Sequence, residues 1–304
     1  MSSDPNPGRR AAGTGERIVR ANGVDLCVQA FGDPADPAIL LMAGNACSMH
    51  WWREEFCLRL AERSRYVIRY DNRDTGRSVS YQPGAAPYTG RDLAADAVGL
   101  LDALDLPGAH LVGWSMGGGL AQLIALEHPE RVASLTLIST SPAGPGQFHP
   151  DLPPMTDELG AHFAGQAPPA DWSDRAAVID WMVASERALA RSQPFDEAAV
   201  RQFLERDLDR SASPASRTNH FAIGAGEPWR HRLPTIAAAT LVIHGTEDPL
   251  FPYGHAVALA TGIPDAELVP LPDTGHELPR AGWDTVIAAI ARHTSPRRPG
   301  RPRT

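Results

Sequence analysis

Three residues of this chain have the types and the order needed for nucleophilic catalysis: Ser115, Asp248 and His276. Ser115 lies in a G-W-S-M-G sequence at positions 113–117, between a short apolar run and a segment with helical periodicity. A strand, a sharp turn that carries serine and a helix together form a nucleophile elbow, which holds the serine hydroxyl clear of the sheet. Glycine two positions before and two after the serine avoids clashes in this strained turn. The pattern therefore predicts Ser115 as the nucleophile.

A serine hydroxyl is a poor nucleophile at neutral pH, so it needs a base, and the base needs an orienting acid. His276 and Asp248 each follow a predicted strand, which brings both to the sheet edge where open α/β sheets bind ligands. The chain order Ser, Asp, His is the order of this kind of active site. Glu247 and Asp273 are alternative acids. Asp248 is preferred because Pro249 closes the turn directly after it.

The reaction also needs hydrogen-bond donors for the negative charge that develops on the substrate carbonyl oxygen. In a nucleophile elbow, one donor is the backbone N–H of the residue after the nucleophile, which is Met116 here. The other donor is expected in the turn after the apolar run at 38–42, from Gly44 or alternatively from Asn45. Gly44 has no side chain, so a substrate carbonyl can approach its backbone closely.

The elements that must position these residues alternate between strands and helices. Apolar runs predict the strands, and apolar residues at helical spacing predict the helices. Near-continuously apolar strands that alternate with helices indicate an α/β fold with a mostly parallel sheet covered by helices on both faces. A hairpin at 17–20 and 25–31 is followed by strands at 38–42, 66–70, 111–112, 135–138, 240–243 and 267–269, and helices are expected at 91–104, 120–126, 254–260 and 283–293.

The strand pattern stops within the chain and resumes about ninety residues later, which predicts an insertion. We therefore divide the chain into a first part of the core at 16–140, a helical cap insertion at 141–234 and a second part of the core at 235–294. The tails at 1–15 and 295–304 are rich in proline, glycine and arginine and lack large apolar runs. Such composition predicts disordered tails.

The cap is expected to lie over the catalytic residues and to select the substrate. Ligand pockets are mostly apolar, and the cap carries several aromatic residues. We predict that Trp181 and Met182 of the cap contact substrate, together with Asn45 and Trp114 of the core. Helices are expected at 157–163, 175–189 and 197–208, and the other large apolar candidates are Trp172, Phe203, Phe221 and Trp229.

Composition narrows the class of protein. The chain has 304 residues, of which 43% are hydrophobic, and a net charge of −8, so nucleic-acid binding is not indicated. Three cysteines without a C-x-x-C pair are typical of reduced thiols in a cytoplasmic protein. No apolar run is long enough for a membrane span. The predicted catalytic residues need neither a cofactor nor a metal, and we expect a cytoplasmic monomer or homodimer.

The residues around the nucleophile, with Asp248 and His276 in order, resemble the α/β-hydrolase superfamily. The segments at 31–38, 69–78 and 93–98 resemble those of the aclacinomycin methylesterases, which act on anthracycline antibiotics. This resemblance implies a serine esterase that forms an acyl-enzyme and cleaves a methyl ester of a bulky, polyketide-like substrate. Many members of the superfamily carry His-Gly where this chain has Met42 and Ala43 before the oxyanion turn.

The charged residues of the segment at 69–78 are interpreted as structural. Asp71, Arg73 and Arg77 are expected to form a charge network rather than to act as catalysts.

Two other classes of function remain open at this stage. An aminopeptidase of the proline iminopeptidase type would need acidic residues in the cap to hold a free amine, and Glu186, Glu197 and Glu205 are candidates. A ligand receptor that keeps the catalytic residues but turns over slowly is the second. Haloalkane dehalogenases and epoxide hydrolases are disfavoured, because they use aspartate where this chain has Ser115.

Overall fold

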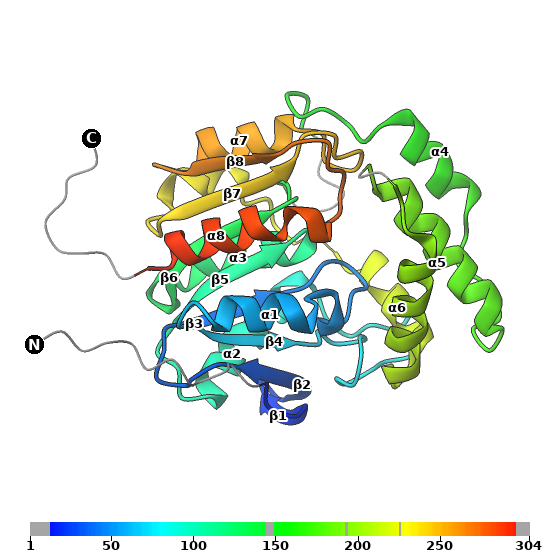
Figure 1. Ribbon diagram of the computed structural model, residues 1–304, viewed down its shortest axis with the longest axis horizontal. Helices are drawn as coiled ribbons and strands as arrows, with labels where there is room; N and C mark the ends of the chain where they lie inside the picture. The colour runs from blue at the N-terminus through cyan, green and yellow to red at the C-terminus, as the bar shows by residue number, and fades with distance from the viewer. Residues whose placement is uncertain (1–12, 144–148, 192–193, 225, 296–304) are drawn as a thin grey trace, which may run out of the picture.

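The computed structural model describes residues 13–143, 149–191, 194–224 and 226–295. An eight-stranded sheet with the order β1-β2-β4-β3-β5-β6-β7-β8 forms its centre (Figure 1). β2 is antiparallel to both of its neighbours, and all the pairs from β4 to β8 are parallel. The strands are β1 (Arg17–Ala21), β2 (Val24–Phe31), β3 (Ala38–Met42), β4 (Tyr66–Tyr70), β5 (Ala109–Trp114), β6 (Val132–Ile138), β7 (Thr240–Gly245) and β8 (Glu267–Leu271).

Helices cover both faces of the sheet, which confirms the predicted α/β fold class. The apolar runs are continuous because successive side chains point to opposite faces and both faces are buried. In β3, Ile39 and Leu41 pack in one core cluster, whereas Leu40 and Met42 pack in the other. α1 (Glu54–Ala61) and α8 (Trp283–His293) cover the first face, and α2 (Gly90–Ala103), α3 (Met116–Glu127) and α7 (Gly254–Gly262) cover the second.

The opening hairpin was predicted correctly, whereas α1 was not predicted. Asn22 and Gly23 both have positive φ, the signature of the tight turns that match the twist of paired strands. α1 buries Phe56, Cys57 and Leu60 against the sheet. It has only eight residues, so it offers about two turns of periodicity to recognise.

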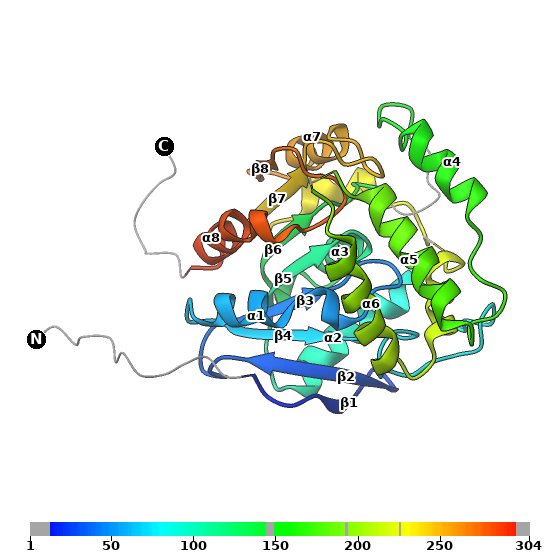
Figure 2. The same cartoon turned by 45° about the vertical axis from the view of Figure 1, so that its right-hand side comes forward.

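The predicted insertion lies between β6 and β7. Its described residues form three α-helices, which lie together beside one end of the sheet (Figure 2). An apolar cluster of its own holds α5 and α6 together, with Met182 and Phe203 among its members. The helices of the cap are α4 (Asp157–Gly165), α5 (Arg175–Leu189), α6 (Glu197–Arg210) and the 3-10 helices η3 (Pro214–Phe221) and η4 (Arg230–Thr235); the core adds η1 (Met49–Trp51), η2 (Pro129–Arg131) and η5 (Arg280–Gly282).

The two predicted tails lie almost wholly outside the described residues. Of the residues at the tails that the structure does describe, Thr14 donates its backbone N–H to the carbonyl of Ala30 in β2. Within the described ranges, no helix combines the length and the apolar composition that a membrane span requires.

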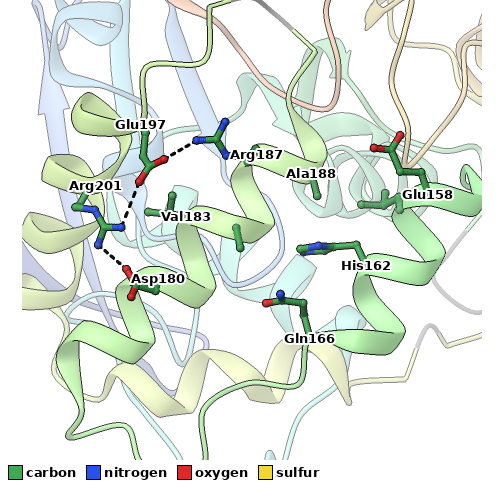
Figure 3. A pocket seen from close by; sticks show the side chains of 11 residues that line it. Glu158, His162, Gln166, Asp180, Val183, Arg187, Ala188, Glu197 and Arg201 are labelled. Atoms are coloured by element: carbon green, nitrogen blue, oxygen red, sulfur yellow. Dashed lines mark hydrogen bonds and ion pairs between the residues drawn. The ribbon is translucent and has the colours of Figure 1, made fainter.

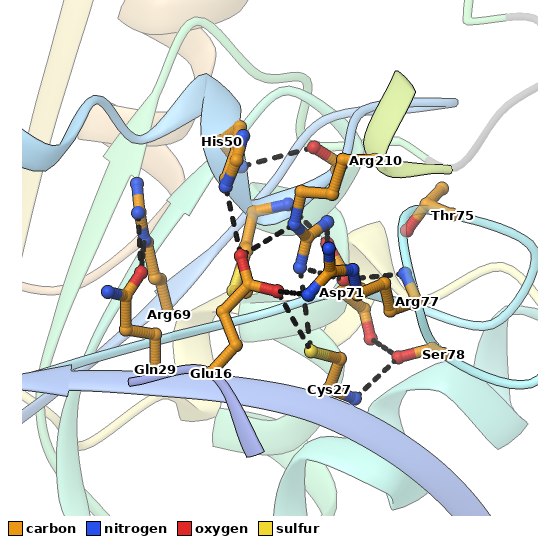
Figure 4. A network of polar contacts seen from close by, with 12 residues as sticks. Glu16, Cys27, Gln29, His50, Arg69, Asp71, Thr75, Arg77, Ser78 and Arg210 are labelled. Carbon is orange, nitrogen blue, oxygen red and sulfur yellow. Dashed lines mark hydrogen bonds and ion pairs between the residues drawn. The ribbon is translucent and has the colours of Figure 1, made fainter. Parts of the chain in front are cut away.

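Buried ion pairs tie the cap to the core. Arg210 at the end of α6 contacts Glu16 and Asp71, and His50 and Arg77 also contact Glu16 (Figure 4). The guanidinium of Arg73 pairs separately with Asp96 of α2. Asp71, Arg73 and Arg77 therefore all form ion pairs that connect different segments of the fold.

A second buried pair lies nearby. Asp207 of α6 accepts a hydrogen bond from Ser48 of the core and pairs with Arg217 of η3. Because these side chains are buried, the cap is attached to the core by contacts that exclude water.

Candidate active site

Ser115 occupies a sharp turn between β5 and α3. Its backbone has φ 54° and ψ −119°, a conformation that L-residues adopt only under strain. Several hydrogen bonds hold it there. The Ser115 N–H donates to the carbonyl of Ile138 at 2.9 Å, and its own carbonyl accepts from Thr140 Oγ1 at 2.7 Å and from the N–H of Gly118 at 2.9 Å. The strain is therefore fixed by the neighbouring strand and by the first turn of the helix.

The glycines of the motif are required by close backbone contacts. A Cβ on Gly113 would lie 2.2 Å from the carbonyl oxygen of Gly117, and a Cβ on Gly117 would lie 2.3 Å from that of Met42. Real Cβ atoms do not approach other atoms so closely, so any side chain at these positions would force the turn open. The spacing in the sequence reflects how tightly α3 packs on β5 and β3.

Ser115, His276 and Asp248 form an unbroken chain of hydrogen bonds. Ser115 Oγ lies 2.9 Å from His276 Nε2, and His276 Nδ1 lies 2.8 Å from Asp248 Oδ2. Because the carboxylate accepts a hydrogen bond from Nδ1–H, Nε2 is free to accept the serine proton. All three residues follow strands at the same edge of the sheet, after β5, β7 and β8.

Asp248 is held as a carboxylate by its surroundings. Oδ1 accepts the backbone N–H groups of Leu250 and Phe251 at 2.9 and 2.8 Å, and His244 Nε2 lies 3.3 Å from Oδ2. Burial opposes ionisation, but the nearby His276 and the hydrogen bonds from His244 and His276 outweigh it and hold the pKa of Asp248 below its usual range. His244 is fully buried. Sequence reasoning missed it, although it precedes Asp248 by four positions.

The alternative acids lie on the surface. Glu247 and Asp273 are both exposed, whereas Asp248 is 2% exposed.

The cap contacts the loop that carries His276 directly, since the N–H of His276 donates to the carbonyl of Leu189 at the end of α5. A Cβ on Gly275 would lie 2.3 Å from that same carbonyl oxygen. Gly275 therefore lets the cap approach the loop.

The predicted oxyanion turn lies beside the nucleophile. A Cβ built on Gly44 would be 3.4 Å from Ser115 Cβ. Among the residues that the structure describes, the N–H groups of Gly44, Asn45 and Met116 have no acceptor within the protein. Donors left unpaired next to a nucleophile are suited to an oxyanion. The N–H of Ala46, by contrast, donates to His220 Nδ1 at 3.0 Å and is not available.

A largely apolar cavity of about 490 Å³ opens next to Ser115. Asn45 and Met116 line it on the core side, and the cap contributes residues from its first loop and from the segment around η3. The side chains that give it an apolar wall are Leu120, Leu123, Leu152, Met155, Phe221, Ile223, Trp229, Leu250 and Phe251. Its volume suits a drug-sized ligand.

Trp181 and Met182 lie away from this cavity. Neither is among its lining residues. Trp181 packs edge-on against Trp172 with ring centroids 5.9 Å apart, and its indole N–H donates to the carbonyl of Gln166. Met182 belongs to the apolar cluster inside the cap. Trp114 instead lies beside His276, with 6.4 Å between the two ring centroids. Trp181 and Met182 of α5 pack within the cap, and the wall of the cavity comes from other segments.

A second cavity, of about 590 Å³, lies within the cap between α4, α5 and α6 (Figure 3). Four of its charged residues pair with one another: Glu197 contacts Arg187 and Arg201, and Arg201 also contacts Asp180. Ser115 does not line it. This cavity is therefore separate from the one at Ser115.

None of the three acidic candidates for an amine site, Glu186, Glu197 and Glu205, is among the described residues that line the cavity at Ser115. Glu197 is engaged in the ion pairs just described. Glu186 lies near Arg53 and Glu277. Burial and the charge of Glu277 raise the pKa of Glu186 to about 8 against the opposing effect of Arg53.

Comparisons with known proteins show which family the chain resembles. A model of the alpha/beta hydrolase fold family matches residues 37–279. The rhodomycin D methylesterase of Streptomyces sp. (strain C5) is 33% identical over 294 residues, which cover 91% of this chain and 97% of that protein. The rhodomycin D methylesterase of Streptomyces peucetius is 33% identical over 307 residues, with the same coverage. A putative carbamate hydrolase of Variovorax paradoxus (strain S110) is 33% identical over 256 residues, 80% of this chain and 86% of that protein.

Solved structures are similar in fold. An esterase from Exiguobacterium antarcticum superposes with a TM-score of 0.72 at 21% identity, covering 91% of this chain and 98% of that chain. A meta-cleavage product hydrolase from Pseudomonas fluorescens IP01 has a TM-score of 0.71 at 22% identity, covering 91% and 96%. At 21% and 22% identity, these two structures show a similar fold over 91% of this chain.

Proposed function

The chain belongs to the α/β-hydrolase family, and we propose that within it the protein is a serine esterase that cleaves a carboxylic ester through an acyl-enzyme. The observation that carries this proposal is the hydrogen-bond chain from Ser115 through His276 to Asp248, with distances of 2.9 and 2.8 Å. Such a chain activates a serine hydroxyl for attack on a carbonyl carbon.

In the proposed mechanism Ser115 Oγ attacks the ester carbonyl while His276 Nε2 takes the hydroxyl proton. Asp248 keeps the histidine in the required tautomer and stabilises its positive charge. The negative charge on the carbonyl oxygen is stabilised by the N–H of Met116 and by that of Gly44 or Asn45. His276 then returns the proton to the departing alcohol. Water, deprotonated by the same histidine, hydrolyses the acyl-enzyme and releases the acid.

For the substrate, we propose a methyl ester of a bulky, polyketide-like aromatic compound. Two relatives that match 91% of the chain are named rhodomycin D methylesterases. The apolar cavity of about 490 Å³ at Ser115 supports an apolar acid portion of this size. Methanol is a small leaving group, so most of the binding energy must come from the acid portion.

The test combines labelling with a panel of substrates. A fluorophosphonate probe is expected to label Ser115 in the wild-type protein, as shown by peptide mapping. Methanol release from a polycyclic aromatic methyl ester should exceed release from methyl acetate in kcat/KM, and p-nitrophenyl acetate should report the basic esterase activity. No labelling and no hydrolysis of any ester would contradict the proposal.

The same panel separates the two competing classes of function. Preference for an amino-terminal proline amide over every ester would indicate an aminopeptidase. Among the described residues, Glu186, Glu197 and Glu205 do not line the cavity at Ser115 and so give that activity no support. Efficient labelling of Ser115 with very slow turnover of all substrates would indicate a ligand receptor.

A further inference from the structure

His220 in η3 has both ring nitrogens bonded to the backbone of the core. Nδ1 accepts the N–H of Ala46 at 3.0 Å, and Nε2 lies 2.7 Å from the carbonyl oxygen of Arg73. An N–H group can donate only to an unprotonated nitrogen, and a carbonyl can only accept, so the proton of His220 is on Nε2. The ring is 4% exposed and lines the cavity at Ser115. A side chain of the cap thus contacts the turn that holds the oxyanion donors.

That turn has an unusual residue at its strained position. The N–H of Cys47 donates to the carbonyl of Gly44 at 3.2 Å, which closes a four-residue turn with Asn45 and Ala46 at its centre. Ala46 has φ 59°. A positive φ at the third residue is the pattern of a type II turn, where glycine or asparagine is favoured because other side chains are strained there. The chain has alanine at this position, so the turn needs support from outside.

The hydrogen bond from the Ala46 N–H to His220 Nδ1 stabilises the turn at its central peptide. Types I and II differ mainly by a flip of the central peptide, which here joins Asn45 to Ala46. The Ala46 N–H belongs to this peptide, so its bond to His220 Nδ1 opposes a flip to the type I form that alanine would otherwise prefer. A flip would change ψ of Asn45 and φ of Ala46 and would turn the Asn45 carbonyl oxygen to the side that the Ala46 N–H now occupies. The bond to His220 therefore fixes the shape of the turn that carries the N–H groups of Gly44 and Asn45.

The neighbouring contacts hold η3 in place. Asn219 donates to Asp74 Oδ2 at 2.8 Å and accepts the N–H of Gly84 at 2.7 Å, and both partners belong to the core. Ser216 donates to the carbonyl of Tyr81 at 2.6 Å. The position of His220 is therefore determined by how the cap is seated on the core.

We propose that His220 is a positioning residue, which holds the turn of Gly44 to Cys47 in the conformation that directs its backbone donors at the substrate carbonyl oxygen. Catalysis then depends on the seating of the cap, because the residue that fixes the turn is part of the cap. This inference rests on the proposed esterase function and on the role of this turn in it.

Two isosteric substitutions separate the two bonds of the ring. In His220→Gln the amide nitrogen can replace Nε2–H toward Arg73, but the acceptor for Ala46 is lost. In His220→Asn the amide oxygen can replace Nδ1 toward Ala46, but the donor toward Arg73 is lost. With p-nitrophenyl acetate, His220→Gln should lower kcat by about 10- to 100-fold, the scale of a misplaced catalytic group. KM should stay within about 3-fold, and His220→Asn should lose much less.

Adding Ala46→Gly to His220→Gln tests the strain directly. Glycine adopts a positive φ without cost, so the double variant should recover at least about 5-fold in kcat over His220→Gln. Ser216→Ala is the matched control, because it removes a bond between η3 and the core that does not reach the turn. It should keep kcat within about 2-fold. Thermal melts of all variants are compared with these rates.

Equal losses of kcat in the Gln and Asn variants, a change in KM alone, or no recovery by Ala46→Gly would each overturn the inference. A measurement on the wild-type protein covers the case in which His220→Gln does not fold. Nitrogen NMR of the imidazole should show the Nε2–H tautomer for His220, with slow hydrogen exchange at the Ala46 amide, and the Nδ1–H tautomer would overturn the assignment. Loss of the proposed function differs from all of these, because the wild-type protein would then show neither ester hydrolysis nor labelling of Ser115.

Discussion

Arg210 and Asp71 form a buried, two-pronged ion pair between the cap and the core. Arg210 Nη1 and Nη2 donate to Asp71 Oδ1 and Oδ2 at 3.0 and 2.6 Å, and the two side chains are 5% and 0% exposed. Gly76 makes room for the pair, since a Cβ there would lie 2.2 Å from both Arg210 Nη1 and Asp71 Oδ2. The pair therefore explains a glycine in a loop that lies far from α6 in the sequence.

Removing the cation of this pair should destabilise the protein strongly. Arg210→Met leaves Asp71 buried without its charged partner, and such changes cost about 3–5 kcal/mol. Urea unfolding followed by tryptophan fluorescence measures the loss. Arg77→Met is the control, because the Arg77 side chain is 57% exposed in its pair with Glu16 and should contribute at most about 1 kcal/mol. Equal losses in the two variants would contradict the importance of the buried pair.

Ser115→Ala should abolish ester hydrolysis and fluorophosphonate labelling and leave the fold intact. The change removes only a hydroxyl group, and single removals within such a set of catalytic residues cost several orders of magnitude in turnover. Initial rates with p-nitrophenyl acetate and circular dichroism measure the two outcomes. Full labelling at a different serine in this variant would reject Ser115 as the nucleophile.

Asp248→Asn should lower kcat by about 10⁴-fold, because the amide favours the wrong tautomer of His276. Glu247→Gln and Asp273→Asn serve as controls that change a neighbouring acid on the surface. Both should keep most of the activity. If Asp273→Asn proves the more damaging change, Asp248 is not the orienting acid.

Phe221→Ala should reduce selectivity for bulky esters. Phe221 lines the cavity and is 61% exposed, so its loss should affect the protein's own packing little. We expect kcat/KM for a polycyclic methyl ester to fall by about 10- to 200-fold, the effect of one lost apolar contact, with little change for p-nitrophenyl acetate. Trp181→Ala is the comparison within the cap. A larger change of selectivity in Trp181→Ala than in Phe221→Ala would show that α5 contacts the substrate.

His220 should also make stability depend on pH. Burial lowers the pKa of His220 from 6.5 to about 4, with Arg217 acting in the same direction and Asp74 and the bond to Arg73 opposing it. Between these values the unfolded chain binds a proton that the folded protein does not, so stability falls as the pH decreases from about 6.5 to about 4. The lowered pKa of His220 changes the free energy of unfolding by at most about 3 kcal/mol over this pH range.

The matching measurement compares wild-type protein with His220→Gln, which has no titrating group at this position. Urea unfolding at pH 7 and at pH 4.5 should show a smaller loss of stability for the variant. A loss of the same size in both proteins would show that His220 does not bind a proton on acid unfolding.

Much of the scaffold could be predicted from local patterns. All five residues of β3 are buried, so apolar and polar residues do not alternate in this strand. The continuous apolar run is still typical of a strand that is covered on both faces. In the G-x-S-x-G motif, Gly113 is required by the nearby backbone of Gly117, whereas Gly117 is required by the carbonyl of Met42 in β3. Both requirements appear in the sequence as one short motif, because the serine turn places both glycines against backbone. The order of the strands then brings Asp248 and His276 to the same sheet edge as Ser115.

The wall of the cavity and the contact of His220 with the turn at Ala46 depend on the tertiary structure alone. A helix that packs inside the cap and one that faces a ligand have the same apolar periodicity, so the sequence could not distinguish Trp181 from Phe221. His220 lies 174 positions from Ala46, and nothing near either residue in the sequence indicates the bond. Sequence by itself determined the fold class and the catalytic motif, because these depend on short-range spacing and strand order. The substrate wall and the cap-to-turn contact depend on how two distant segments pack.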